Sequence, residues 1–154
     1  MPFTIIIVLS IIILYYKNSI NTGKKIQGRY IKVFRDTPDP ISYADFIIYG
    51  NKKVMNPTSI TIKPSLNHGN GINPQAISSD LSDIVLVETK KGNNPYILYD
   101  LGTTKEISQI IIINRKKFKE MMDDVFLVIL DSHKTKVYEY RINKIQDIYV
   151  INVS

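Results

Sequence analysis

Hydrophobic and polar residues alternate along much of this chain, most clearly between residues 95 and 115. Residues 96–101 (YILYDL) place successive side chains on opposite faces, which is the period-two pattern of a strand. Gly102 interrupts the pattern, and the polar residues 103–106 are typical of a turn. Residues 107–113 then form a run too apolar to have a wetted face. We therefore expect two strands joined by a turn, with the second strand in the middle of a sheet.

Short segments of the same kind recur after residue 28, with turn residues between them. A helical period is missing there, apart from a single turn expected within residues 118–124. About nine strands at such spacing are typical of a β-sandwich or jelly roll. We predict an all-β, jelly-roll-like β-sandwich. The expected strands cover residues 29–35, 44–50, 59–64, 83–90, 96–101, 107–113, 124–132, 135–142 and 147–153.

The longest stretch without a strand pattern covers residues 64–83. A loop of this length is uncommon unless it is functional or lies across the sandwich. Three of its polar side chains, Asn67, His68 and Asn70, are candidates for contact with a ligand. The alternative is a covering loop whose polar groups bond to backbone or water.

Residues 1–16 contain no charged side chain. As a helix they would extend about 24 Å, and Tyr15, Tyr16 and the stem of Lys17 would bring this close to the roughly 30 Å of a bilayer's hydrocarbon core. We expect residues 1–17 to be a transmembrane anchor whose partner is the lipid bilayer. A cleavable signal peptide and a buried core helix are the alternatives.

Basic residues follow the apolar segment and none precedes it. The positive-inside rule then places the C-terminal part on the cytosolic side of a membrane that the chain crosses once. Residues 18–27 form a polar linker, and residues 28–154 form the sandwich domain.

The composition narrows the function classes. Alanine is nearly absent, which disfavours a helix-rich fold. The net charge of +6 is spread along the chain and forms no stripe or recognised motif, so we expect no nucleic acid partner. Because the chain has no cysteine, disulfides and thiolate metal sites are excluded.

Several of these segments also resemble a known family. GRYIKVFR and ISYADFIIYG, within residues 28–50, are similar to a strand pair of the discoidin, or coagulation-factor type C, domain of the galactose-binding-like superfamily. PYILYDLG and the pattern I-x-x-I-x-I-x-N-R of residues 107–115 are also similar to it, and residues 126–142 look like its closing hairpin. Versions led by the RYIKV segment are associated with large DNA viruses of eukaryotes. The resemblance implies a galactose-binding-like sandwich from residue 28 to about residue 153.

The resemblance also suggests where a ligand would bind. Fucose-binding members use one histidine and two arginines, and here the candidates are His68 and Arg115 with Lys116, Lys117 and Lys119. Lysine cannot reproduce the planar fork of arginine, so sugar recognition is not supported residue by residue. We interpret Arg115 chiefly as a residue at a strand end that pairs with a carboxylate. The full set of candidate contacts is Asn67, His68, Asn70, Arg115, Lys116 and Lys117.

Two adjacent pairs have both a functional and a structural interpretation. Met121 and Met122 match the apolar loop tips of membrane-binding members, or they fill the core, which we favour. Asp123 and Asp124 are either part of a cation site or the charged start of a strand, which we favour.

No catalytic motif occurs in the sequence, so we expect no enzymatic activity and no cofactor. The expected function is that of a minor capsid component that links an internal virion membrane to the capsid shell. Its partners would be capsid or other virion proteins. The alternatives are a lectin-like attachment module that binds a glycan and a peripheral lipid-binding domain.

Overall fold

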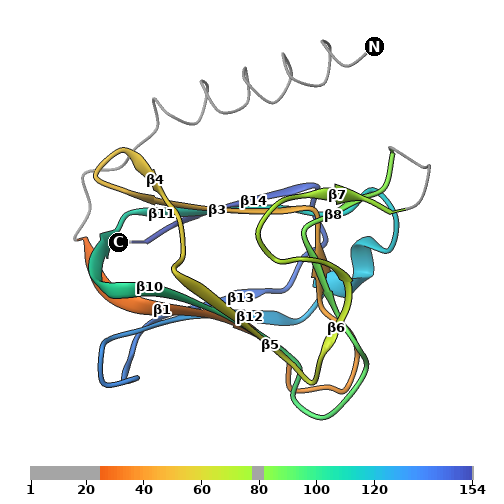
Figure 1. Cartoon of the computed structure of the whole chain (residues 1–154), viewed down its shortest axis with the longest axis horizontal. Coiled ribbons are helices and arrows are strands. Elements are labelled where there is room, and N and C mark those ends of the chain that lie inside the picture. The colour runs from red at the N-terminus through yellow and green to blue at the C-terminus, as the bar shows by residue number, and fades with distance from the viewer. Residues whose placement is uncertain (1–24, 78–81, 154) are drawn as a thin grey trace.

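The computed structural model describes residues 25–77 and 82–153. There the chain folds into two main antiparallel sheets that lie one above the other as a β-sandwich (Figure 1). The expected anchor (residues 1–17), with Tyr15, Tyr16 and Lys17, lies outside the described residues, as does most of the linker. In the described part, no helix has both the length and the apolar character needed to cross a membrane.

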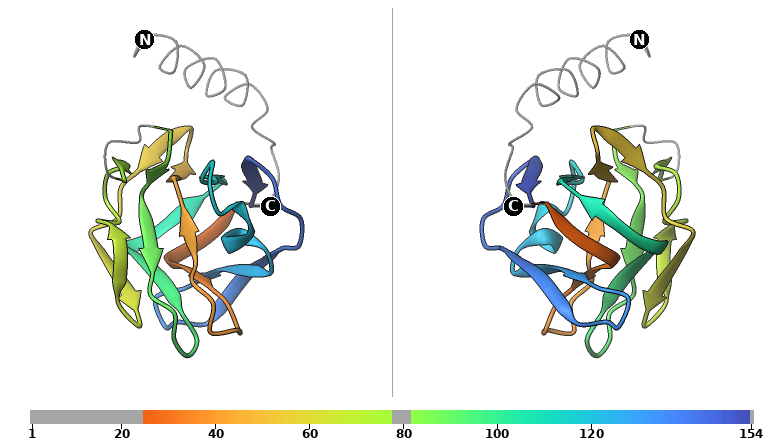
Figure 2. Two further views of the ribbon diagram at one scale, coloured as in Figure 1. Left: turned by 90° about the vertical axis from the view of Figure 1, so that its right-hand side faces the viewer. Right: turned by 90° about the vertical axis from the view of Figure 1, so that its left-hand side faces the viewer.

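The lower layer in Figure 1 is a five-stranded sheet of order β13-β12-β1-β10-β5. Its strands are β1 (Ile26–Phe34), β5 (Ser59–Lys63), β10 (Tyr96–Ile107), β12 (Val125–Leu130) and β13 (Lys136–Ile142). The upper layer is a four-stranded sheet of order β14-β11-β3-β4. Its strands are β3 (Asp45–Gly50), β4 (Lys53–Met55), β11 (Gln109–Ile113) and β14 (Ile148–Asn152). Figure 2 views both layers from the two ends of the sandwich.

Smaller elements gather at the right-hand end of the sandwich in Figure 1. A three-stranded sheet has the order β2-β9-β6, and β7 pairs with β8. These strands are β2 (Ser42–Tyr43), β6 (Leu66–Gly69), β7 (Gln75–Ala76), β8 (Ile84–Val85) and β9 (Val87–Thr89). The turn expected within residues 118–124 is confirmed as a 3-10 helix, η1 (Lys119–Met122).

The core lies between the two main sheets, because alternate residues of their strands point inward. In β10, Ile97, Tyr99 and Leu101 are buried while the residues between them are partly exposed, so the predicted alternation is confirmed. The apolar strand β11 lies between β14 and β3, and Ile110 and Ile112 belong to the core. Its predicted place within a sheet is confirmed.

The turn predicted over residues 103–106 is wrong. β10 runs on from Tyr96 to Ile107, and its last residues pair with the beginning of β1 across a shift in register. Gly102 has a φ of +79° and donates its N–H to the Asp100 carboxylate at 2.7 Å, which allows a local irregularity without ending the strand. The chain changes sheets only at Ser108, after which β11 begins.

The segment from 64 to 83 is more regular than its sequence predicts. β6 and β7 both lie within it, and β6 pairs with β9. The single strand expected over residues 83–90 is divided at Leu86 into β8 and β9. Leu86 bonds instead to Tyr43 through its N–H and to the backbone of residues 70 and 71 through its carbonyl oxygen. Short strands of this kind escape prediction because a few residues hold too little of the alternating pattern.

Candidate functional site

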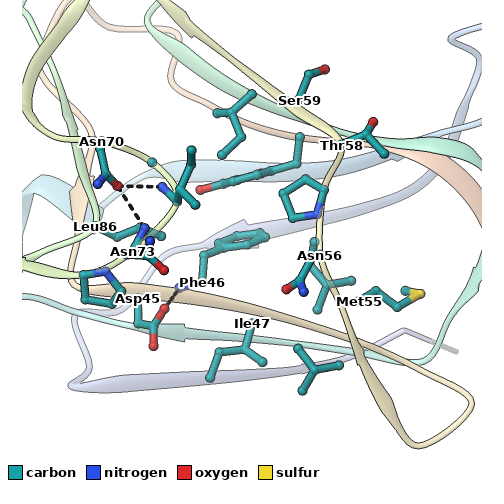
Figure 3. Close-up of a pocket in the computed structure, with 18 of the residues that line it drawn as sticks. Asp45, Phe46, Ile47, Met55, Asn56, Thr58, Ser59, Asn70, Asn73 and Leu86 are labelled. Carbon is teal, nitrogen blue, oxygen red and sulfur yellow. Dashed lines mark hydrogen bonds between the residues drawn. The ribbon is translucent and has the colours of Figure 1, made fainter.

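A cleft opens on one side of the sandwich, between the edges of the two main sheets (Figure 3). Its volume is about 590 Å³, within the range of roughly 300–1,000 Å³ that is usual for ligand pockets. β3 and β4 form one wall and β5 faces them, while residues 56–58 and 70–74, Leu86 and Tyr99 complete the lining. β4 and β5 are both edge strands, so the cleft lies where the sandwich is not closed by strand pairing.

Stacked aromatic rings form the inner part of the cleft. The rings of Phe46 and Tyr99 stack with centroids 4.5 Å apart, and Tyr43 packs against Phe46 at 5.5 Å. The hydroxyl groups of Tyr43 and Tyr99 share a hydrogen bond of 2.7 Å. Tyr43 and Tyr99 are both buried, so this wall is fixed before any ligand arrives.

The loop of residues 70–74 is held rigidly at the mouth of the cleft. The side-chain oxygen of Asn70 accepts the N–H groups of Ile72 and Asn73, both at 2.9 Å (Figure 3). The backbone N–H groups of Asn70 and Gly71 donate to the carbonyl oxygen of Leu86 at 3.1 and 2.9 Å. These bonds keep Ile72 at the mouth although its side chain is 72% exposed.

An exposed apolar residue lies on the other side of the mouth as well. Val54, in β4, is 55% exposed and lines the cleft together with Met55. Large apolar side chains exposed beside an apolar cavity are typical of binding surfaces. The cleft therefore combines an apolar interior with exposed apolar side chains at its mouth.

Asp45 brings a carboxylate to the wall of this apolar cleft. It is partly buried, and its Oδ1 accepts the N–H of Phe46 at 2.8 Å. Burial raises the pKa of Asp45, although the hydrogen bond from Phe46 acts in the opposite direction. Within the described residues Asp45 forms no ion pair with a lysine or arginine. The cleft can therefore offer an anionic acceptor to a ligand.

The buried pair of Tyr43 and Tyr99 behind the cleft predicts that folding stability falls at alkaline pH. Burial raises the pKa of Tyr43 and Tyr99 above the ordinary value near 10. Above about pH 10 the unfolded chain ionises both groups and the folded chain does not, so we expect stability to fall by about 1.4 kcal/mol per pH unit for each tyrosine. Denaturant unfolding at a series of pH values between about 9 and 11 measures this slope.

The control separates these two groups from the other tyrosines. A chain carrying both Tyr43→Phe and Tyr99→Phe is expected to have a smaller slope, and the rest of the slope comes from Tyr49, Tyr138 and Tyr149, whose pKa is also raised by burial. Tyr140→Phe, at a position 39% exposed, is the control and should keep the slope of the unchanged chain. An equal slope in the double variant and the unchanged chain would contradict the assignment.

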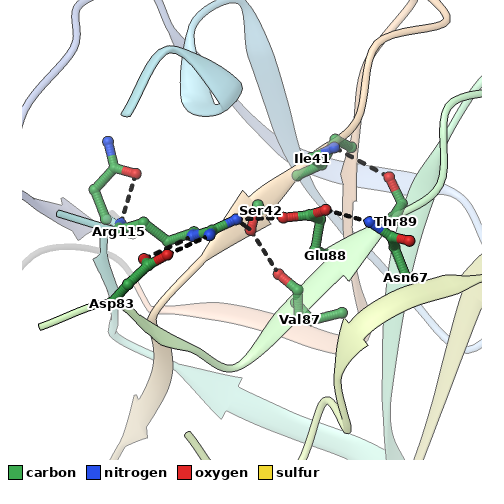
Figure 4. Close-up of polar contacts among 9 residues, drawn as sticks. Ile41, Ser42, Asn67, Asp83, Val87, Glu88, Thr89 and Arg115 are labelled. Atoms are coloured by element: carbon green, nitrogen blue, oxygen red, sulfur yellow. Dashed lines mark hydrogen bonds and ion pairs between the residues drawn. The ribbon is translucent and has the colours of Figure 1, made fainter. Parts of the chain in front are cut away.

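Arg115, a predicted site residue, lies in a buried ionic network apart from the cleft (Figure 4). The side chain is 2% exposed. Its Nε and Nη2 donate to the Asp83 carboxylate at 3.1 and 2.7 Å, and its Nη1 donates to Ser42 Oγ at 3.1 Å and to Glu88. Burial acts to lower the pKa of Arg115, but the bonds and charges of Asp83 and Glu88 outweigh it and raise the pKa. The predicted pairing of Arg115 with a carboxylate is confirmed.

Asn67 belongs to the same network. Its side-chain amide donates to the other carboxylate oxygen of Glu88, so Glu88 joins Asn67 and Arg115 (Figure 4). Two residues predicted as ligand contacts are thus brought together, but by a carboxylate that both bind. Since the arginine head is buried, the arrangement ties β2, β9 and the end of β11 together.

The other predicted contacts are dispersed. His68 is exposed in β6, with its backbone paired to Glu88. Lys116 and Lys117 are exposed on the loop that follows Arg115. Asn70 alone among the six predicted contacts lines the cleft.

The structure also places the two adjacent pairs, Met121–Met122 and Asp123–Asp124, that had both a functional and a structural interpretation. Met122 is fully buried in the core, so the core-filling interpretation is confirmed for it. Asp124 bonds to Arg141 Nε at 2.7 Å. In the described part of the chain, no cluster of three or more histidine, aspartate or glutamate side chains is placed to hold a metal ion.

Sequence reasoning misses most of the cleft because its lining comes from segments far apart in the chain. Asp45 and Phe46 lie in a strand, Asn56 and Thr58 in a crossover, and Ile72 in a loop. One signal was present: Ile72 is a large apolar residue within the polar run HGNGINPQ, where it has no strand to belong to.

Comparisons of this chain with protein-family models, with curated proteins and with solved structures found no significant match.

Proposed function

We propose that this chain is a non-catalytic structural protein of a virus particle, anchored in an internal virion membrane by residues 1–17, that binds a capsid or other virion protein through the cleft. The uncharged N-terminal segment and the basic residues after it support the anchor and the cytosolic orientation. The resemblance to discoidin-like domains of large DNA viruses supports the viral setting and a galactose-binding-like, jelly-roll fold for the sandwich.

One observation carries the binding role: an apolar cleft of about 590 Å³ with Ile72 and Val54 exposed at its mouth. Protein interfaces concentrate their binding energy where an apolar side chain of one partner fills a pocket of the other. On the side of β3 away from β11, no strand of the described residues pairs with residues 45–47, because β4 pairs only with residues 48–50. A partner segment therefore finds both a pocket and an unpaired strand edge.

Location in the particle is the first test. Mass spectrometry of purified particles is expected to detect the chain in the detergent-extracted membrane fraction, including peptides from residues 1–17. Absence from particles would overturn the structural role, and recovery of a chain without its N-terminal peptide would overturn the anchor.

The second test concerns the cleft. With a photo-crosslinking amino acid at position 73, a loop position that lines the cleft, we expect a crosslink to a shell protein in assembled particles. Ile72→Asp should reduce the crosslink at least about tenfold, because a carboxylate at the mouth disfavours an apolar partner. The matched control is Ile145→Asp, since Ile145 is 45% exposed and does not line the cleft. Equal losses from both variants would contradict a role for the cleft.

A lectin-like role is the second candidate, and the polar rim of the cleft favours it. Asn56, Ser59 and Asn73 place amide and hydroxyl groups around the cleft that holds the Phe46 ring (Figure 3). Sugars are commonly held by such groups because their hydroxyls need hydrogen bonds while their C–H faces pack on aromatic rings. A glycan array probed with the full chain tests this, and no binding at millimolar glycan would remove it.

A further inference from the structure

Among the residues that the structure describes, Asp45 is the one acidic side chain that lines the cleft. Eleven of the other lining residues are aliphatic, aromatic or proline, and those nearest in sequence to Asp45 are Phe46, Ile47 and Ile48. A carboxylate beside so much apolar surface is poorly solvated, which is why burial raises its pKa. The Phe46 N–H supplies one hydrogen bond, and the remaining acceptor sites of the carboxylate have no protein donor among the described residues.

Most other acids at partly buried positions of the described residues have a cation partner, and the exception, Asp131, instead accepts the backbone N–H groups of His133 and Thr135. Asp100 is paired with Arg29 at 2.9 Å, and Glu106 with Lys25 at 2.7 Å. The buried Asp83 and Glu88 share Arg115. Asp45 is partly buried, as Asp100 and Glu106 are, and has no cation of its own within residues 25–77 and 82–153. A cation of a bound partner would form an ion pair with Asp45, as Arg29 does with Asp100.

The geometry of the cleft restricts where that cation comes from. The apolar floor of Phe46, Tyr99 and Leu86 fits an apolar side chain. The Asp45 carboxylate lies close by, on the other side of the β3 ribbon from the Phe46 ring (Figure 3). A partner that buries an apolar side chain on this floor would bring the neighbouring residues of its own chain to the wall. In an extended partner segment, consecutive side chains point to opposite sides, so a charged residue next to the apolar one would face Asp45.

We propose that the cleft recognises a segment of a partner protein in which a large apolar side chain fills the pocket and an adjacent lysine or arginine pairs with Asp45. This deepens the proposed function and rests on it, because it names the chemistry of the protein segment that the cleft would hold. The apolar side chain supplies most of the affinity, and the ion pair supplies selectivity against apolar segments that lack a cation.

A displayed library of random short peptides provides the test. Peptides are selected on the full chain in detergent and counter-selected on the Ile72→Asp chain, so that only segments that need an intact mouth are kept. We expect the enriched peptides to place lysine or arginine next to a large apolar residue. An enriched peptide should bind the Asp45→Asn chain about tenfold or more weakly, because hydrogen bonds to charged groups are the stronger ones.

Control substitutions in the chain and in the peptide distinguish a loss of the ion pair from a loss of folding. Asp39→Asn is the control variant, since Asp39 is exposed outside the cleft, 3.8 Å from Lys91, and its loss should leave binding unchanged. Replacing the peptide's basic residue with glutamine should weaken binding to the unchanged chain about tenfold and have little further effect on the Asp45→Asn chain.

The outcomes separate this inference from the proposed function. If enriched peptides show no basic preference and bind the Asp45→Asn chain as well as the unchanged one, the role of Asp45 is overturned and the apolar pocket remains. If no peptide distinguishes the unchanged chain from the Ile72→Asp chain, the cleft does not bind protein segments, and the proposed function fails with it.

Discussion

Replacing Arg115 with alanine is expected to lower the free energy of unfolding by about 3–5 kcal/mol, because it leaves two carboxylates buried without a cation. Asp83 and Glu88 both bind the guanidinium, and the exposed fractions of their side chains are only 6% and 8%. In water such charges lose little when a partner is removed, but here neither can regain the solvation that folding removed. Denaturant unfolding of the full-length chain measures the loss.

Arg141→Ala is the matched control for this prediction. Arg141 also pairs with an aspartate, Asp124, but the side chains are 58% and 50% exposed. Exposed pairs contribute about 0–1 kcal/mol, so we expect the control to unfold nearly as the unchanged chain does. Similar losses in the two variants would contradict the prediction that the buried Arg115 network stabilises the fold more than the exposed pair does.

Arg115→Lys tests the geometry of the network separately from its charge. Lysine keeps the cation but cannot bind Asp83 with two parallel hydrogen bonds while also reaching Glu88 and Ser42. We expect a loss of stability smaller than that of Arg115→Ala and larger than that of Arg141→Ala. A lysine variant as stable as the unchanged chain would mean that charge alone matters at this position.

Ile112→Ala is expected to cost about 2–5 kcal/mol, through the lost burial of the side chain and the cavity that remains. Ile112 is fully buried in the middle of β11, with strands on both sides, so its surroundings cannot collapse easily into the space. The midpoint of denaturant unfolding is the measurement. The control is Ile145→Ala, whose side chain is 45% exposed and should change stability by no more than about 0.5 kcal/mol. Losses of equal size would contradict the assigned core.

The apolar run of β11 and the alternation in β10 were read correctly because each depends on the residues of one strand. Consecutive side chains of a strand point to opposite faces of the sheet, so the local sequence pattern predicts which of them are buried. At Gly102 the local pattern was not sufficient to predict the structure. A break in the alternation has the same appearance whether the chain turns back or passes through a register shift, and pairing with β1 decided for the latter.

For Arg115, the sequence predicted the role of the residue but not the identity of its partners. Its position after an apolar strand indicated a structural role and a carboxylate partner, but no pattern identified Asp83 and Glu88 as that partner. These acids come from separate segments that meet Arg115 only when β2, β9 and β11 are assembled. Asn67, predicted from the sequence as a ligand contact, is part of the same network, because its side-chain amide donates to Glu88.

The amino-acid pattern was thus sufficient for the all-β class and for the position of most long strands, since both depend on side-chain alternation between neighbours in the chain. The cleft, the isolated carboxylate of Asp45 and the partners of Arg115 became visible only in three dimensions. Each depends on residues 25 or more positions apart that are brought together by sheet pairing, such as Asp45 and Ile72 at one mouth. Contacts of that range leave no periodic trace in a single sequence, because any one of the distant residues can be polar or apolar for local reasons alone.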